Sequence, residues 1–310
     1  MKRFIRNLII FICCVVVAFL AVFIPIQCLP PQFSDTFDAA AIDKYDLLMK
    51  TESPKIILVS GSNFAFGMNS EELSQAFSMP VVNLGLHAGI KPHFTVKMAE
   101  QNIGEGDIIL VGFEYEQYGK REIDVPTAME TIENYPRMWK LVSPADYFLI
   151  FKGYLSEYGF IKIDRYQNGY EPTTGAYARN AFDEYGDNDY PRTENIRTSY
   201  EQDVEIDDNN ITDSMIRELN HLNKIATKNG AKVYLTYPSI DQAVILTNED
   251  EWEKFDKKLQ ENLDFPIISK MRDYIFDSQY FYDTDYHLTM DGREIRTKQL
   301  ISDMEEFGIK

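Results

Sequence analysis

Short apolar segments alternate with helical patterns along this chain, and this alternation restricts the possible folds more than any other feature. Residues 56–60, 80–84 and 107–112 are typical of strands, and a further strand is expected over residues 231–238. Segments that are apolar throughout indicate parallel strands with both faces buried. With helices between them, they predict an α/β domain of three layers around a parallel sheet.

Helical patterns separate and follow these strands. We expect helices over residues 37–50, 70–77, 92–102, 212–229, 249–262 and 290–307. Asn69 is a suitable cap for the helix at 70–77, because its side chain can accept a hydrogen bond from the first turn. Residues 119–210 interrupt the pattern with many tyrosines and Asn-Gly and Gly-Asp turns. This stretch is too long for a loop, so we interpret it as an inserted cap region with a helix near 144–158.

A run of 19 residues without a charge, residues 8–26, lies near the amino terminus. At ~1.5 Å per residue its helical length approaches the ~30 Å thickness of a bilayer core. Three basic residues precede it: Lys2, Arg3 and Arg6. By the positive-inside rule the amino terminus is cytoplasmic. A cleaved signal peptide is the alternative, but the run is long for one and no small-x-small site follows closely.

We therefore expect a single-pass protein of the cell membrane, with an anchor over residues 1–31 and an extracytoplasmic domain over residues 32–310. The net charge of −18 argues against nucleic acid as a partner. The cysteines lie within the apolar run or at its edge: Cys13, Cys14 and Cys28. Internal disulfides, cysteine catalysis and thiolate metal sites are thereby excluded from the domain. We expect no metal and no cofactor, because neither a histidine pair at ligand spacing nor a glycine-rich phosphate loop is present.

Three residues follow the ends of successive strands: Ser62, Gly85 and Glu114. In parallel α/β sheets such positions meet at one edge, where ligands bind. Ser62 then has two interpretations, an ordinary strand-to-helix turn or a nucleophile. A serine nucleophile needs a base, which is usually histidine.

The chain has four histidines, His87, His93, His221 and His287. His221 lies within a helical pattern. His87 and His93 flank the loop after the second strand, so they either line the edge of the sheet or have no role in the site. His287 stands directly before the last helix, with Asp283 and Asp285 just ahead of it. An acid beside a catalytic histidine fixes its tautomer, so this setting suits a base. The alternative is a helix-capping region with solvated aspartates.

Four segments, "VSGSNFAFG", "VNLGLHAG", "LVGFEYEQY" and "FYDTDYHLTMDG", resemble the SGNH/GDSL hydrolase superfamily in this order. The resemblance is closest to its membrane-anchored bacterial branch, which includes the D-alanyl-transfer protein of teichoic-acid modification and alginate acetyltransferases. It extends over residues 52–118 and 212–308 and leaves the insertion unmatched. It implies a flavodoxin-like, three-layer α/β fold and acyl-ester chemistry.

The resemblance also implies roles for individual residues. Ser62 matches the nucleophile, whose backbone N–H is the first oxyanion donor, and Gly85 matches the glycine that supplies a second. His287 matches the base. Glu114 stands near the position of an asparagine whose amide donates to the oxyanion, and an ionised glutamate can only accept. Losing one such donor costs ~10²–10³ in rate in other acyl-transfer enzymes.

Two asparagines, Asn63 and Asn83, are near enough in sequence to compensate for the missing amide donor. We expect Glu114 and His87 to line the site. The acid of the triad is left open by spacing alone. The usual superfamily spacing falls on Thr284; the relatives that this stretch most resembles place the acid at Asp283, and alginate-type relatives at the position of Asp285. We favour Asp283.

These features predict an extracytoplasmic serine esterase or O-acyltransferase that acts on acyl groups of a cell-surface glycan. The alternative is a catalytically weak or inactive protein of the same fold that assists a multi-pass membrane acyltransferase. The substitution at Glu114 motivates this second hypothesis.

Overall fold

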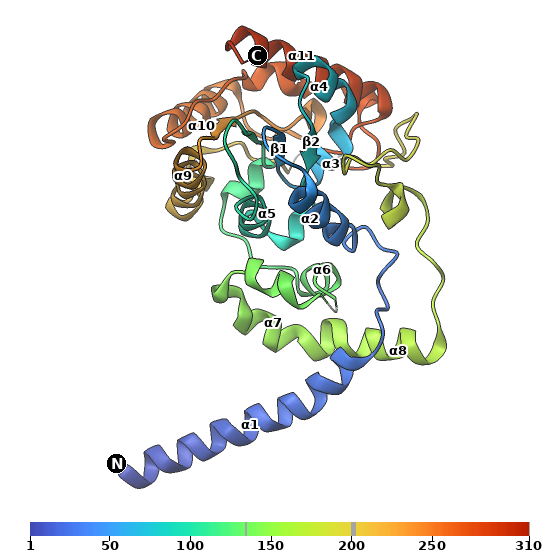
Figure 1. Cartoon of the computed structure of the whole chain (residues 1–310), viewed down its shortest axis with the longest axis vertical. Coiled ribbons are helices and arrows are strands. Elements are labelled where there is room, and N and C mark those ends of the chain that lie inside the picture. Colours follow the sequence, from blue (N-terminus) through green and yellow to red (C-terminus); the bar gives the residue numbers. More distant parts are fainter. Residues whose placement is uncertain (134, 200–202, 310) are drawn as a thin grey trace.

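The computed structural model describes residues 1–133, 135–199 and 203–309 and shows an α/β protein with one long projecting helix (Figure 1). Its main sheet has four parallel strands in the order β2-β1-β3-β4. The strands are β1 (Ile56–Val59), β2 (Val81–Asn83), β3 (Ile108–Val111) and β4 (Lys232–Leu235). In the central register, Ile56 lies between Val81 and Ile108. The predicted parallel α/β class is confirmed.

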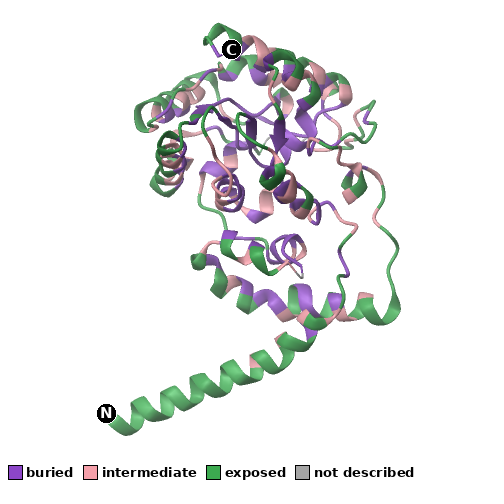
Figure 2. Cartoon of the chain, viewed as in Figure 1, coloured by how far each residue is buried: buried purple, intermediate pink, exposed green. Residues whose placement is uncertain are grey.

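Both faces of the sheet are covered, as Figure 2 shows by the burial of the central strands. Side chains alternate between the faces along a strand. Ile57 and Val59 therefore pack in one apolar cluster with helices α5 (Pro92–Ala99) and α9 (Asp213–Lys228). Ile56 and Leu58 pack in a second cluster with α4 (Ser70–Phe77) and α11 (Met290–Glu306). This two-sided burial explains why the strand segments are apolar throughout.

Helix ends follow local capping chemistry. The Asn69 side chain accepts from the Glu72 N–H, which confirms the predicted cap of α4. Thr289 caps α11 by accepting from the Gly292 N–H, and this fixes the start of the helix just after His287. The other helices of the domain are α2 (Ala40–Lys50), α3 (Ser62–Gly67) and α10 (Glu249–Asn262). A separate two-stranded parallel pair is formed by β5 (Ile240–Asp241) and β6 (Ile275–Phe276).

The insertion begins with helices and ends as irregular chain. Its helices are α6 (Val125–Thr131), α7 (Tyr147–Gly153), a π-helical turn (Tyr154–Gly159) and α8 (Phe160–Asn168). The helix expected near 144–158 thus extends to Asn168. The irregular part returns to the main sheet, where Asp187 accepts hydrogen bonds from Ser70 and from the Asn83 amide. The insertion therefore packs against the sheet edge and supplies side chains to it.

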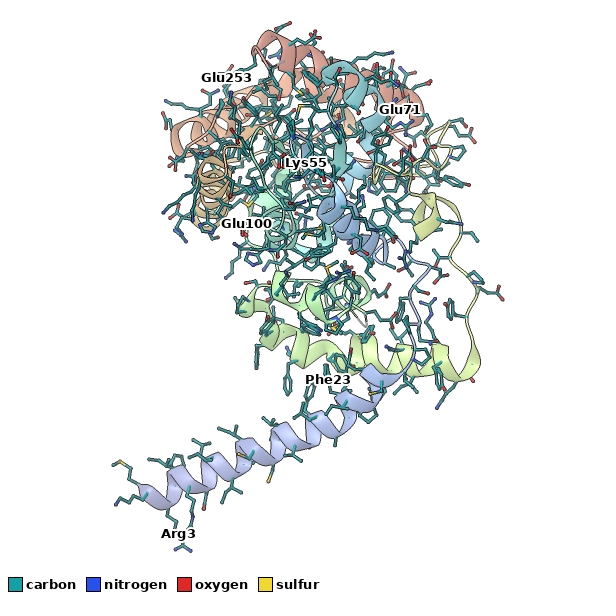
Figure 3. The ribbon with its side chains drawn as sticks, in the orientation of Figure 1. Arg3, Phe23, Lys55, Glu71, Glu100 and Glu253 are labelled. Atoms are coloured by element: carbon teal, nitrogen blue, oxygen red, sulfur yellow. The ribbon has the colours of Figure 1, made fainter. Side chains whose placement is uncertain are left out.

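Helix α1 (Lys2–Cys28) is long and apolar enough to cross a membrane, by length and composition. It projects from the body and is exposed along almost its whole length (Figure 2), and Ile26 is its one buried residue. Arg3 lies at its free end, and Phe23 lies where the helix meets the insertion (Figure 3).

Candidate active site

The structure brings Ser62, His287 and Asp283 together at the carboxyl edge of the sheet. Ser62 is the first residue of α3, directly beyond β1, and its Oγ lies 2.8 Å from His287 Nε2. His287 Nδ1 in turn lies 3.0 Å from Asp283 Oδ1. In this series the imidazole is placed to remove the serine proton, and the carboxylate is placed to hold the imidazole in the required tautomer.

A turn around Thr284 decides which aspartate reaches the imidazole. Thr284 Oγ1 accepts from the backbone N–H groups of Tyr286 and His287, and the turn folds Asp283 back onto the ring. Asp285 instead lies 2.6 Å from the guanidinium of Arg197. The structure thus places Asp283 at the imidazole and Asp285 in an ion pair outside the triad.

Asp283 is held in its ionised form. Burial alone would raise the pKa of this carboxyl, but hydrogen bonds from His287 and Tyr177 outweigh burial and lower the pKa below its ordinary value. An ionised carboxylate is the form that stabilises an imidazolium.

Two residues at the triad were not predicted from the sequence. The Tyr177 hydroxyl donates to Asp283 Oδ2 at 2.6 Å and lies 3.2 Å from His287 Nδ1. Tyr177 comes from the insertion, and no motif marks it. The Phe66 ring stacks on the imidazole of His287, with centroids 3.8 Å apart and planes within 3° of parallel. Phe66 lies one helical turn after Ser62, and this spacing is a signal that could have identified it.

Glu114 lies beyond β3 and packs directly beside the serine turn. Its Oε1 accepts from the Asn63 backbone N–H at 2.9 Å. A Cβ at position 61 would overlap the Glu114 carboxyl, so a larger residue before Ser62 would force that side chain to move. Glu114 Oε2 is buried and has no hydrogen-bond partner in the described part of the chain. Burial raises the pKa of Glu114, although the Asn63 N–H favours the ionised form.

The other expected oxyanion donors have acceptors of their own. The Gly85 N–H donates to the Asn83 Oδ1 at 2.9 Å, and the Asn83 amide donates to Phe64 O at 2.8 Å. The Asn63 amide donates to Gly112 O at 2.9 Å. The structure therefore uses Gly85, Asn63 and Asn83 to tie the strand ends together and does not present them to the pocket.

A pocket of about 240 Å³ opens above the triad. Its lining residues are Ser62, His87, Ala88, Glu114, Glu116, Arg121, Tyr177, Thr284, Tyr286 and His287. His87 lines this pocket, and burial lowers its pKa. His93 lies elsewhere, beside Glu218, and His221 is exposed on α9. Among the described residues, no group of three or more His, Cys, Asp and Glu side chains is placed to hold a metal ion.

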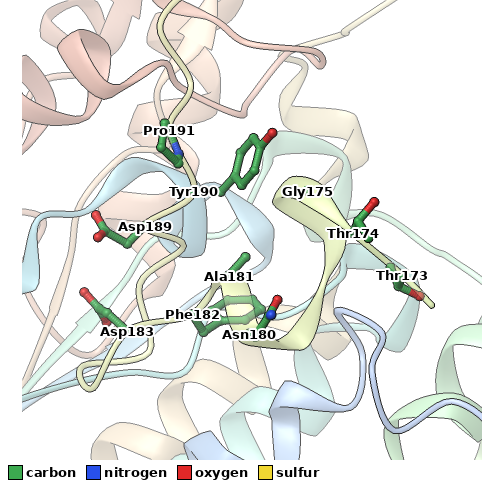
Figure 4. Close-up of a pocket in the computed structure, with 10 residues that line it drawn as sticks. All are labelled: Thr173, Thr174, Gly175, Asn180, Ala181, Phe182, Asp183, Asp189, Tyr190 and Pro191. Carbon is green, nitrogen blue, oxygen red and sulfur yellow. The ribbon is translucent and has the colours of Figure 1, made fainter.

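A second cavity, of about 470 Å³, is formed by the insertion alone (Figure 4). It is lined by Thr173, Thr174, Gly175, Asn180, Ala181, Phe182, Asp183, Asp189, Tyr190 and Pro191. Its wall includes Gly175, which begins the short turn that carries Tyr177 to Asp283. The cavity is therefore one backbone turn away from the triad.

No model of a protein family matches this chain, and no curated protein matches it either. Its function has to be inferred from the side chains that converge at the sheet edge.

Proposed function

We propose that this protein is a membrane-anchored serine esterase or O-acyltransferase of the SGNH/GDSL type, with the three-layer, flavodoxin-like fold of that superfamily. The observation that carries the proposal is the series of short contacts from Ser62 Oγ through His287 to Asp283. Such a series, at the carboxyl edge of a parallel sheet and beside a pocket, is the arrangement that nucleophilic catalysis by serine requires.

Ser62 Oγ attacks the ester carbonyl carbon while His287 Nε2 removes the hydroxyl proton. The tetrahedral intermediate collapses, the C–O bond to the alcohol breaks, and His287 returns the proton to the leaving oxygen. The acyl group then rests on Ser62. Water or a sugar hydroxyl attacks the acyl-enzyme with His287 as base, which releases the acid or the new ester and restores Ser62. Asp283 stabilises the imidazolium in both halves of the reaction.

Two donors are assigned to the oxyanion in this mechanism. The Ser62 N–H lies in the first turn of α3, where N–H groups are not used by the helix itself. Glu114 supplies the other donor when it is protonated, because a protonated carboxyl group carries an O–H. Burial raises the pKa of this carboxyl and so favours that form. Among the described residues its Oε2 has no hydrogen-bond partner, so a proton on this oxygen is not already donated to another acceptor there.

A pH profile tests the role of Glu114. Because burial raises its pKa, the O–H donor persists to higher pH than for an ordinary glutamate and is lost as pH rises through that pKa. We expect wild-type kcat to fall by ~10²–10³ as pH rises through the pKa of Glu114, as when one oxyanion donor is removed. This fall is the alkaline limb of the pH profile. Glu114→Gln has an N–H donor at every pH, and its profile should lack the limb.

Glu116→Gln is the matched control, since Glu116 is a second carboxyl of the same pocket whose pKa is raised by burial. Its alkaline limb should remain. If the fall in kcat at high pH persists in Glu114→Gln and disappears in Glu116→Gln, the titrating group is Glu116. The proposed role of Glu114 as an oxyanion donor would then be wrong.

The proposed substrate is an acyl group on a cell-surface glycan. A pocket of about 240 Å³ suits a short acyl chain, and the polar cavity of the insertion suits a sugar. Tyr190 contributes an aromatic face to that cavity (Figure 4). We assign α1 as the anchor, with the amino terminus cytoplasmic because of Lys2, Arg3 and Arg6. The catalytic body then lies outside the cell, where such glycans are found.

A second candidate function is that of an inactive partner of a multi-pass membrane acyltransferase. The engagement of Gly85, Asn63 and Asn83 with other acceptors favours it, because it leaves the oxyanion site with few donors. A fluorophosphonate probe separates the two functions, since this reagent forms an adduct with an activated serine. We expect the full-length protein in detergent to be labelled at neutral pH. Absence of labelling, with the protein folded, would favour the partner function.

A further inference from the structure

One continuous helix of the insertion, formed by α7, the π-helical turn and α8, has two unlike sides. We call it the insertion helix. One side is buried, against the body of the protein and, at Tyr154, also against α1: Ile150, Tyr154, Tyr158 and Lys162. The other carries large apolar side chains that are exposed, and we call it the aromatic face: Tyr147, Phe148, Phe151, Phe160 and Ile161. Phe148 is 72% exposed and Phe160 61%, which is unusual for a group of such residues on one helix.

The insertion helix runs along the carboxyl end of α1. The Phe151 ring lies 4.2 Å from the Phe19 ring, between centroids, and the Tyr154 ring lies 4.7 Å from Phe23. The amide of Gln27 donates to the Tyr154 hydroxyl. These contacts fix the position of the insertion helix along the axis of α1, and so its height relative to the apolar run of α1.

That height places α7 within the apolar span of α1. Phe19 precedes Ile26, the last residue of the apolar run, by seven residues. At ~1.5 Å per residue, Phe19 lies ~10 Å inside the end of the span. Phe151 packs at the level of Phe19, whereas Gly159 lies against Ile26 at the end of the span. The insertion helix therefore slants from the level of the acyl chains, at α7, to the level of the headgroups, at α8.

We propose that the aromatic face is immersed in the bilayer leaflet next to the carboxyl end of α1, as an interfacial helix. This inference rests on the proposed role of α1 as a membrane anchor. Apolar and aromatic side chains of such helices enter the boundary between headgroups and acyl chains, while the opposite side stays with the protein or with water. Lys152, which is exposed beside this face, has a stem long enough to bring its ammonium group to the headgroups.

The consequence is a body held at two points on the membrane. α1 alone would allow the body to rotate about its end, whereas an immersed insertion helix fixes its height and tilt. The irregular chain that follows α8 leads directly to the second cavity and to Tyr177 at the triad. The contact of the insertion helix with the membrane therefore also constrains the segment that supplies Tyr177 to the site.

Quenching of tryptophan fluorescence by brominated lipids tests the inference on the full-length protein. The chain has two tryptophans, and Trp139→Phe with Trp252→Phe removes them. Into this background we would introduce Phe148→Trp and, as a second position on the aromatic face, Phe160→Trp. The protein is reconstituted alone in phosphatidylcholine vesicles whose acyl chains carry bromine, and thermal unfolding confirms that each variant is folded.

Two reference positions make the outcomes distinguishable. Val16→Trp reports on α1. Phe307→Trp reports on an exposed residue that directly follows α11, and α11 lies at the opposite end of the molecule from α1 (Figure 1). We expect quenching of Phe148→Trp comparable with that of Val16→Trp, weaker quenching of Phe160→Trp, and none of Phe307→Trp.

Quenching of Val16→Trp without quenching of either aromatic-face variant would overturn the inference. That result would mean that α1 enters the bilayer while the aromatic face stays in water or awaits a protein partner. No quenching of Val16→Trp would instead refute the anchor itself, and the inference with it.

Discussion

Ser62→Ala is expected to lower kcat for hydrolysis of a simple acetyl ester by about 10⁶-fold, the size of the loss when a serine protease loses its nucleophile. Ser62 Oγ lies within hydrogen-bond distance of His287 and supplies the attacking atom, so no other group in the pocket replaces it. The fold should be unaffected, because the side chain is small and faces the pocket. Turnover and thermal unfolding are both measured on the full-length protein in detergent.

Ser239→Ala is a matched control for this experiment. Ser239 is also buried, and its hydroxyl has no hydrogen-bond partner in the described part of the chain. Its replacement should leave turnover unchanged. Hydrolysis by Ser62→Ala at the wild-type rate would exclude the serine mechanism, whatever the control shows.

Asp283→Asn should lower kcat by about 10⁴-fold, the loss that an acid-to-amide change causes in a triad of this kind. The asparagine keeps the shape of the side chain but presents an amide donor to His287 Nδ1 or to Tyr177, so the imidazole is held in the wrong tautomer. The protein should still fold, since both residues have the same volume. The measurement is kcat with an acetyl ester at the pH of maximal wild-type activity.

Asp285→Asn is the matched control for Asp283→Asn. Asp285 pairs with Arg197, which also lies 3.3 Å from Asp241, so the loss of one charge leaves the guanidinium with a partner. We expect a change in kcat of less than tenfold. The reverse ranking would assign the acid to Asp285, and two mild effects would mean that neither aspartate belongs to a triad.

The parallel sheet follows from local signals in the sequence, whereas the pairing of Ser62 with His287 was expected from the resemblance to the SGNH/GDSL superfamily. Apolar strands and helical periods fix which residues stand at strand ends, and the carboxyl ends of parallel strands meet at one edge. The cap at Asn69 was predictable for the same reason, because a cap involves only the next turn of the chain.

Features that depend on contacts between distant segments were not predictable. Tyr177 reaches Asp283 from an insertion without a motif, and its place is decided by how that segment packs on the sheet edge. The engagement of Gly85 by the Asn83 side chain is a rotamer choice that the sequence does not reveal. From the sequence, Glu114 was expected to be an ionised acceptor. Its burial beside Gly61, which raises its pKa, became visible with the structure.

Ser62 is expected to carry the acyl group during turnover. The most direct test is to mix the full-length protein with an activated acetyl ester, stop the reaction with acid, and measure peptide masses. We predict a burst of product and a gain of one acetyl group on the peptide that contains Ser62. An acetyl group on another residue, or turnover without any acylated peptide under burst conditions, would contradict the claim.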